Sequence, residues 1–364
     1  MWSALKKLLS NNKEAFLLLV RLGIGHTSGV LPGHVEWDAI ETLAAQQGLS
    51  AIVLEGIEKL PDNQRPPQVL LLEWIGEMLQ NESVYAVQQK AATKMASLFH
   101  DNYIRTYILK GTIVSECYPN PEQRLSADVD CFLLPSQGEF DAWALGNALI
   151  KARGFEVGTG FYKNSSFHLP EVLVENHQFM VPFRGNKTLK NLELLLQDLM
   201  RNDKGDDGFE GTWLYRPPVM VSALFLVEHA YSHFLHEGLT WRMVLDWVMF
   251  SRKHKKEIDW YALDALIDEY HFRKFYDSFV RLGKYLIGEL DERDLTKVDK
   301  KMLADVWAPL DLHENLHGVK GKLALAGNTW RARWKYHYFS EISWIKALWI
   351  QAYGVLFDKN PKLN

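Results

Sequence analysis

The sequence predicts an α+β protein in which a mixed sheet with flanking helices lies between two helical units. Three observations support this prediction. Apolar residues have helical spacing up to about residue 102, short β-prone segments follow to about residue 200, and helical spacing returns after residue 212. A chain of 364 residues is also longer than one hydrophobic core usually supports. We therefore expect two or three packed units, with boundaries at 1–102, 103–200 and 212–364.

The first unit is predicted to be helical throughout. In "VEWDAIETLAAQQG" the apolar residues recur every three or four positions, and Gly48 is placed to end this helix. Ser50 is placed to cap a second helix. A long helix is expected after "RPPQ", where Gly76 is the sole glycine or proline before residue 103.

The second unit contains the β-prone segments. They are "RTYILKG", "VDCFLLP", "FEVGTGFY", "SSFHLP" and "VLVENHQFMVPF". Gly, Asn and Pro lie between them, and "SQGEFDAWALGNALIKARG" is predicted to form a helix that ends at Gly154. This alternation predicts a mixed sheet with flanking helices.

The third unit follows the polar segment 201–211, "RNDKGDDGFEG", which we expect to be a linker or exposed loop. Near the C-terminus, "ISWIKALWIQAYGVLF" is interrupted by Lys346 and Gln351 and is too short to span a bilayer comfortably. An aromatic helix docked on the core is expected there, and a membrane-surface helix is the alternative. We predict no membrane span.

Composition limits the classes of function. The net charge of −4 gives no general attraction to nucleic acid or anionic membrane, although a local basic patch is compatible with it. Only Cys117 and Cys131 are present, so no disulfide framework is expected. The N-terminal apolar run is short and no small-residue cleavage site follows it, so we predict no signal peptide and a cytoplasmic protein. P-loop, dinucleotide-binding and serine-hydrolase motifs are absent from the sequence.

Two aspartates open one of the β-prone segments, in "RLSADVDCFLLP". Because alternate side chains of a strand share a face, Asp128 and Asp130 should point the same way. Two carboxylates on one face repel each other and are costly to bury unless a cation lies between them. The pattern indicates a divalent metal shared with a phosphate, although a D-x-D pair without a metal is common.

The preceding segment contains features of a phosphate site. Gly111 follows a strand, and a helix is expected from Thr112. A glycine at this position lets backbone N–H groups approach an anion, and a helix N-terminus favours negative charge. Lys110 and Arg124 are placed to bind phosphate oxygens.

The residues described above resemble the motif of a known protein family. "LKG…YPNPEQRLSADVDCFLL" resembles the bacterial uncharacterised nucleotidyltransferase family, a branch of the polymerase beta-like nucleotidyltransferase superfamily. "EWDAIETLAAQQGLSAIVLEGI" and "EHAYSHFLHEGLTWRMVLDW" extend the resemblance over most of residues 15–250. It implies a polymerase beta-like core, a nucleoside triphosphate and one or two Mg²⁺ ions. In the superfamily a glycine turn on one strand precedes a D-x-D pair on the next, and a third acid comes from a later strand.

Matched position by position, the resemblance makes Asp128 and Asp130 the metal-binding pair and Gly111 the turn glycine. "EVLVENHQF" matches the strand of the third acid, and we select Glu175. Glu175 is in the middle of the strand, whereas Glu171 lies beside a proline. The resemblance thus makes Asp128, Asp130 and Glu175 both the metal ligands and the catalytic residues.

Two features depart from the superfamily pattern. Thr112 stands where a serine usually follows the glycine, and the loop before the D-x-D pair is longer. Lys110 precedes the glycine, as it does in the resembled family. The phosphate contacts are therefore expected to differ from those of better-known members.

A row of histidines follows in "EHAYSHFLHEG", where His229, His233 and His236 share one helix face. They could bind zinc, line the nucleotide or acceptor cleft, or simply pack. No cysteine or H-E-x-x-H pattern supports zinc. The resembled family has similar histidines on this helix, which favours the cleft for His229 and His233.

Two further patterns have a structural and a functional interpretation. Asp246, between two apolar residues, either pairs with Arg242 at the surface or faces the cleft and orients a basic group or the nucleotide sugar. The segment "RARWKYHYF", residues 331–339, is predicted to be a solvated helix face with buried aromatic rings. Contact with nucleic acid by charge and stacking is the less favoured alternative.

The sequence therefore predicts a magnesium-dependent nucleotidyltransferase that acts on a nucleoside triphosphate. The acceptor is unknown and could be a small molecule, a peptide or a protein; nucleic acid is possible but is not indicated by the net charge. Transfer of the γ-phosphoryl group on the same scaffold is one alternative. A nucleotide-binding or regulatory module without turnover is the other.

Overall fold

The computed structural model describes residues 2–308 and 330–357, apart from positions 125, 171, 206 and 331. Glu171 and Arg331 thus lie outside the described residues. Within the described part, no helix is both long enough and apolar enough to cross a membrane.

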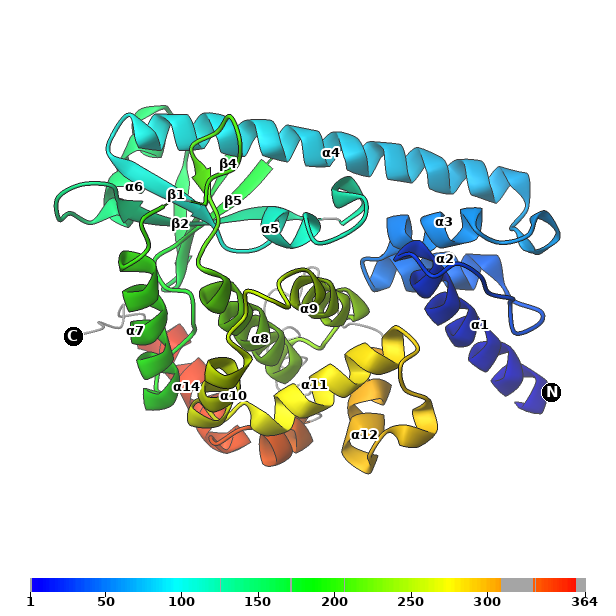
Figure 1. The fold of residues 1–364 in the computed structure, drawn as a ribbon. Helices are drawn as coiled ribbons and strands as arrows, with labels where there is room; N and C mark the ends of the chain where they lie inside the picture. The colour runs from blue at the N-terminus through cyan, green and yellow to red at the C-terminus, as the bar shows by residue number, and fades with distance from the viewer. Residues whose placement is uncertain are drawn as a thin grey trace.

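The chain begins with four helices (Figure 1). They are α1 (Trp2–Gly23), α2 (Trp37–Gln46), α3 (Ser50–Glu58) and α4 (Gln68–His100). Gly48 has φ +67° just after α2, the left-handed conformation that ends helices. Ser50 is the first residue of α3, but Leu49 is its N-cap residue and no side chain caps this helix.

The centre of the fold is a mixed sheet of six strands in the order β3-β4-β5-β2-β1-β6. The strands are β1 (Ile104–Ile108), β2 (Asp128–Pro135), β3 (Val157–Phe161), β4 (Asn164–Leu169), β5 (Val172–His177) and β6 (Leu214–Tyr215). β2 is antiparallel to β1 and parallel to β5. The predicted α+β class and mixed sheet are confirmed, and β6 extends the sheet beyond residue 200.

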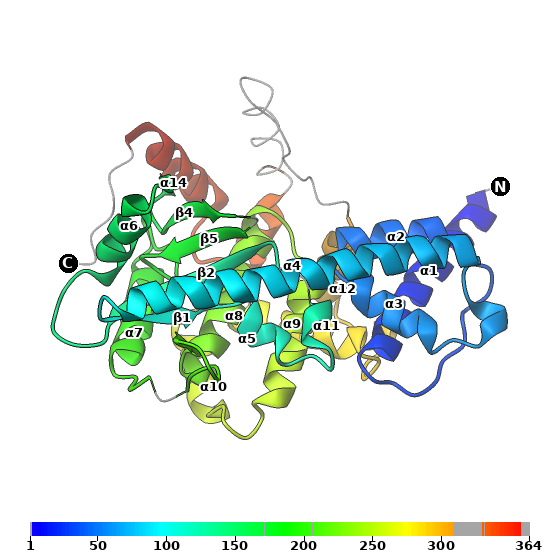
Figure 2. The same cartoon turned by 90° about the horizontal axis from the view of Figure 1, so that it is seen from above.

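The sheet has helices on both faces (Figures 1 and 2). The long α4 runs along one face, where Phe99 lies near Gly146 of α6 (Ala142–Ala152). On the other face Phe225 of α8 (Val219–His236) contacts His177 edge to face, with the ring centroids 6.5 Å apart. Side chains of β2 and β5 that point toward α8 therefore share a layer between the sheet and this helix.

Residues 332–339 are helical, and further helices complete the described part of the fold. They are α5 (Thr112–Ser115), α7 (Lys187–Arg201), α9 (Trp241–Lys253), α10 (Trp260–Glu269), α11 (Arg273–Leu286), α12 (Lys297–Val306) and α14 (Trp344–Phe357). Three short 3₁₀ helices occupy Asp62–Gln64, Pro121–Gln123 and Glu292–Asp294.

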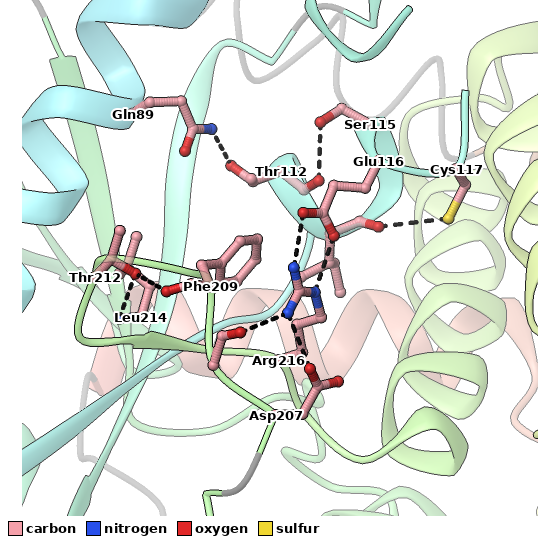
Figure 3. A network of polar contacts seen from close by, with 12 residues as sticks. Gln89, Thr112, Ser115, Glu116, Cys117, Asp207, Phe209, Thr212, Leu214 and Arg216 are labelled. Carbon is pink, nitrogen blue, oxygen red and sulfur yellow. Dashed lines mark hydrogen bonds and ion pairs between the residues drawn. The ribbon is translucent and has the colours of Figure 1, made fainter. Parts of the chain in front are cut away.

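The polar segment 201–211 is fixed to the core by a network around Arg216 (Figure 3). The Arg216 guanidinium donates to both carboxylate oxygens of Glu116, at 2.8 and 2.9 Å, and to Asp207 Oδ1 at 2.9 Å. It also lies over the Phe209 ring, 3.9 Å from the centroid. Residues 207–209 of this segment are therefore held by specific contacts with Arg216.

Helices from the two ends of the chain pack together. Arg21 of α1 donates to the carbonyl oxygen of Leu286 at 2.8 Å. Buried Gln47 donates to the carbonyl oxygen of Val306 and accepts from the backbone N–H of Trp241. These contacts join residues that are more than 190 positions apart in the sequence.

The C-terminal segment contributes aromatic rings to the core. Tyr336 and Phe339 are buried. Lys335 is buried as well, and its ammonium binds the Phe234 carbonyl oxygen at 2.8 Å, so this basic residue does not lie on a solvated face. In α14, Ala347 packs in the core whereas Trp349 is 72% exposed.

Candidate metal and phosphate site

The two strands at the centre of the sheet bring the predicted acids together. In the parallel pair of β2 and β5, Asp130 lies opposite Glu175, and Asp128 lies opposite Leu173. Because opposite residues of paired strands point to the same face, the Asp130 and Glu175 side chains share a face. His177 is two residues further along β5 and therefore joins them.

These three side chains form a compact group. His177 Nε2 is 2.9 Å from Asp130 Oδ1 and 3.5 Å from Glu175 Oε2. One ligand atom from each residue lies within 4.8 Å of the other two. Among the described residues this is the one set of three His, Cys, Asp or Glu side chains close enough to hold a metal ion.

Lys110 lies between the two aspartates of the D-x-D pair. It comes two residues after the end of β1, next to the start of β2. Its ammonium is 3.2 Å from Asp130 Oδ2 and 4.0 Å from Asp128 Oδ1. The side chain is 19% exposed, so these ion pairs are only partly screened by solvent.

The two aspartates have different electrostatic environments. Burial disfavours the charge of Asp130, which is 1% exposed, but Lys110 and His177 outweigh it and hold its pKa below the ordinary value. The Asp128 side chain is 20% exposed. Burial and the neighbouring Asp130 charge raise the pKa of Asp128. A bound cation would relieve the repulsion between them.

Glu175 is also held in its charged form. Its hydrogen bond with His177 lowers its pKa, although burial opposes this shift. The Lys110 ammonium is favoured by Asp130 and Asp128, which outweigh the effect of burial and raise the pKa of Lys110. The site therefore contains charged carboxylates and a positive charge near neutral pH.

Gly111 forms the turn between β1 and α5. It has φ +67° and ψ −104°, a conformation that favours glycine. A Cβ at this position would lie 3.0 Å from Ser126 Oγ, which itself donates to the Asp128 carbonyl oxygen at 2.9 Å. The turn thus packs directly against the start of β2.

The helix expected after Gly111 is a single turn, α5, so its dipole contributes little to anion binding. Thr112 Oγ1 accepts a hydrogen bond of 2.7 Å from Gln89 Nε2 of α4 (Figure 3). This contact attaches the glycine turn to the long helix.

Arg124 and Asp246 form a buried ion pair. Arg124 Nη2 is 2.6 Å from Asp246 Oδ2, and its Nε donates to Oδ1 at 3.1 Å. The Tyr118 hydroxyl donates to the same Oδ1 at 2.8 Å. Arg124 is only 7% exposed. Arg124 and Asp246 are thus paired with each other, and Asp246 has the basic partner that its apolar surroundings require.

The histidines of α8 follow the same face of the helix as Phe225. His229 stacks on Phe225 with the centroids 5.8 Å apart, and His233 lies 4.4 Å from His229. His233 Nδ1 is 2.9 Å from Glu237 Oε2. Burial lowers the pKa of His229 well below its ordinary value, and the positive charge of Lys110 acts in the same direction. His229 is therefore neutral and close to the carboxylate site.

His236 makes different contacts from those of His229 and His233. Its Nδ1 contacts the Ser232 carbonyl oxygen at 2.8 Å, and its ring lies edge to face against Tyr336. The described residues contain no three-histidine metal group, so the row does not form the zinc site that was one interpretation of its spacing.

Two residues of the site were not selected from the sequence. His177 has the same strand parity as Glu175, and this was the available signal. Lys163, in the turn before β4, accepts backbone hydrogen bonds from Gln178 and Phe179 through its carbonyl oxygen. Its charge adds to those that stabilise the Asp130 carboxylate. No motif marks Lys163, because the strand pairing alone brings it to the site.

The donors fit a divalent cation. Asp130 Oδ2 is buried and accepts no hydrogen bond of good geometry within the described structure, although the Lys110 ammonium is near it. Carboxylate oxygens and an imidazole nitrogen are both ordinary ligands for divalent metals. A metal ion would give the unsatisfied oxygen a partner.

The fold and the site together define a mixed-sheet α+β protein with a candidate divalent-cation centre on adjacent strands. The model of the family described as uncharacterised nucleotidyltransferase matches residues 33–288. This match covers well over half of the chain, and the chain belongs to that family. No curated protein and no solved structure matched the chain. Membership implies a nucleoside triphosphate substrate, typically used with a divalent metal.

Proposed function

We propose that this protein transfers a nucleoside monophosphate from a nucleoside triphosphate to an acceptor, with Mg²⁺ as the metal. The observation that carries the proposal is the juxtaposition of Asp130 and Glu175 on paired strands beside Lys110, in a nucleotidyltransferase family member. We further propose that the sheet is a polymerase beta-like core. Residues 1–102 and 212–364 are then the helical units beside the 103–200 core.

In this proposal Asp128, Asp130 and Glu175 hold the metal. When bound, Mg²⁺ neutralises charge on the triphosphate oxygens and on the leaving pyrophosphate. Lys110 adds a positive charge at the same place, and the Gly111 turn lets the backbone approach the phosphates.

The acceptor oxygen attacks the α-phosphorus in line with the departing pyrophosphate. A new P–O bond forms to the acceptor, the bond between the α-phosphorus and the bridging oxygen breaks, and the acceptor proton passes to Glu175 as general base. Glu175 suits this role because its hydrogen bond with His177 keeps it charged and it is only partly buried.

The other candidate residues support the site in different ways. His229 and His233 lie on α8 next to Phe225, which contacts His177, and His229 is neutral. Thr112 anchors the glycine turn through Gln89. We assign Arg124 and Asp246 to holding the loop before β2 in place, because their charges are already paired.

The test uses nucleoside triphosphates labelled on either the α- or the γ-phosphate. Each of the four is incubated with Mg²⁺, the purified protein and a cell extract that supplies acceptors. Transfer of the α-label, absent in Asp128→Asn, supports the proposal. Transfer of the γ-label alone shows phosphoryl transfer, and binding without transfer of either label shows a module without turnover; either outcome would overturn it.

A further inference from the structure

His177 has an unusual set of neighbours for a buried histidine. Its Nδ1 faces the Phe179 carbonyl oxygen at 3.3 Å, and its Nε2 faces Asp130 Oδ1 at 2.9 Å and Glu175 Oε2 at 3.5 Å. All three neighbours are hydrogen-bond acceptors when the carboxylates are charged. His177 is only 2% exposed, so water is not readily available as an alternative hydrogen-bond partner.

A neutral imidazole cannot satisfy both sides. A neutral ring has one N–H donor and one lone pair. A proton on Nδ1 satisfies the Phe179 carbonyl oxygen but leaves the Nε2 lone pair facing two carboxylates, whereas a proton on Nε2 leaves the Nδ1 lone pair facing the carbonyl oxygen. The contacts are satisfied only if the ring carries a second proton or if a cation occupies the space between Nε2 and the carboxylates.

The arrangement matches that of a metal-binding histidine. Such a histidine binds the ion with one nitrogen and donates the N–H of the other, commonly to a backbone carbonyl, which fixes the ring orientation. The contact from Nδ1 to the Phe179 carbonyl oxygen has this form. An independent observation is Asp130 Oδ2, a buried carboxylate oxygen without a hydrogen bond of good geometry.

We infer that His177 is a metal ligand through Nε2, and that Asp130, Glu175 and His177 form a centre that prefers a first-row divalent transition metal over Mg²⁺, with Mn²⁺ serving as its spectroscopic probe. The inference rests on the proposed function for the reaction that the metal serves. Mg²⁺ favours oxygen ligands, whereas imidazole suits later divalent metals. The centre shares two acids with the proposed Mg²⁺ site and replaces Asp128 with an imidazole nitrogen.

The first experiment needs no variant. Mn²⁺ is added to the full-length protein without nucleotide, and pulsed electron paramagnetic resonance measures coupling between the ion and nearby nitrogen nuclei. A directly bound imidazole gives ¹⁴N modulation, which changes to the ¹⁵N pattern when the histidines are ¹⁵N-labelled. Bound Mn²⁺ without nitrogen coupling would overturn the inference, as would the absence of Mn²⁺ binding.

The second experiment identifies the ligand. His177→Gln should abolish the nitrogen coupling and weaken Mn²⁺ binding at least tenfold in calorimetry, while Mg²⁺ affinity changes less than threefold. His168→Gln, the same substitution at an exposed histidine of β4, is the matched control and should keep the coupling. Coupling that survives in His177→Gln and disappears in His229→Gln would assign the nitrogen to α8 and overturn the inference.

The two proposals can fail separately. Thermal melting shows whether His177→Gln is folded, and the isotope experiment on the unmodified chain decides the inference if it is not. Metal binding is measured without nucleotide, so an absence of nucleotidyl transfer leaves the nitrogen coupling intact. Conversely, transfer supported by Mg²⁺ in a protein without nitrogen coupling would support the proposed function and contradict the histidine ligand.

Discussion

Asp128 and Asp130 are two residues apart but differ in burial and in the contacts they make. Asp130 is 1% exposed and contacts both Lys110 and His177, whereas the Asp128 side chain is 20% exposed with Lys110 at 4.0 Å. Removing one partner of a buried ion pair leaves an uncompensated charge, which is costly, but a longer and partly exposed pair such as Lys110–Asp128 contributes less.

Asp130→Asn should therefore lower the free energy of unfolding by about 3 kcal/mol, and Asp128→Asn by less than about 1 kcal/mol. Both variants should lose Mg²⁺ binding, because each removes a proposed ligand charge. Urea denaturation measures the first quantity and calorimetry the second. Equal losses of stability in the two variants would contradict the assigned burial of the ion pairs.

Glu228 on α8 offers a test by pH. It is 2% exposed, its Oε1 has no hydrogen-bond partner among the described residues, and burial raises its pKa to about 8. A carboxyl whose folded pKa is raised stabilises the fold at low pH. This contribution is complete below the unfolded value of 4.5 and is lost as the pH rises through about 8.

Glu228→Gln removes that titration. The stability of the wild type relative to this variant should fall between pH 5 and pH 8, with a slope of up to about 1.4 kcal/mol per pH unit. Urea denaturation at both pH values measures the difference. A difference that stays constant, or rises with pH, would show that Glu228 is charged in the folded protein.

At the residue scale, part of the candidate site could be predicted from the sequence. The parity of Asp128 and Asp130, and the placement of Glu175 inside a strand, needed only strand geometry and the family resemblance. The pairing of Arg124 with Asp246 joins positions 122 apart, and local patterns carry no information about such a contact. His177 had the parity of Glu175, but its tautomer depends on Phe179, whose backbone position is set by the turn after β5.

At the scale of elements, the glycine turn connects β1 to α5 and packs against the start of β2. Gly111 has φ +67° and ψ −104°, and a Cβ there would approach Ser126 Oγ to 3.0 Å. An alanine must adopt a strained backbone conformation or displace Ser126. Gly76, by contrast, is in the middle of α4 with no atom within 4 Å of a Cβ position.

Gly111→Ala should lower the free energy of unfolding by about 1–3 kcal/mol. Gly76→Ala is the control and should raise it by up to about 1 kcal/mol, because alanine favours the helix. Thermal or urea denaturation compares the two. A neutral Gly111→Ala would show that the turn relaxes without strain.

The loop before β2 is connected to α9 by the Arg124–Asp246 pair, which Tyr118 completes. Arg124→Met and Asp246→Asn should each cost about 3–5 kcal/mol, since each leaves a buried group unpaired. The double variant should cost less than the sum, because it leaves neither charge alone. A double-mutant cycle in urea measures the coupling, and additive losses would contradict a direct interaction.

The predicted elements agree best where the pattern is long and local. The strand segments and the long helix after "RPPQ" lie where periodicity and breaking residues indicated. The helix expected from Thr112 is a single turn, α5, whose start is held by Gln89 and the Gly111 turn. The polar segment 201–211 was expected to be a linker or exposed loop, and most of its described residues are exposed, but Arg216 also holds Asp207 through a contact that the segment's composition does not reveal.

At the scale of the whole molecule, the two helical ends of the chain form one body. Phe16 of α1 contacts Trp307 edge to face, and Trp307 contacts Trp241. Arg21 bonds to the end of α11. The boundaries placed by hydrophobic spacing separate residues 1–102 from 212–364, and buried apolar residues of both ranges belong to one continuous core cluster.

This continuity predicts how the molecule unfolds. Gly56 of α3 packs on α1, and an added Cβ would overlap the Leu19 carbonyl oxygen, so Gly56→Ala must separate these two helices. Overpacking of this kind costs about 1–3 kcal/mol. If α1 and α3 are part of one cooperative body, the loss acts on the stability of the whole chain and not only on its first 60 residues.

Differential scanning calorimetry of Gly56→Ala should therefore show one transition, shifted down by roughly 2 °C or more. Gly76→Ala, which changes a glycine at the exposed side of α4, should not shift it down. A new low-temperature transition, with the main one unchanged, would mean that the N-terminal helices unfold alone. The proposed site would then need only the sheet and its covering helices for stability, and the contacts of Arg21 and Gln47 would contribute little to it.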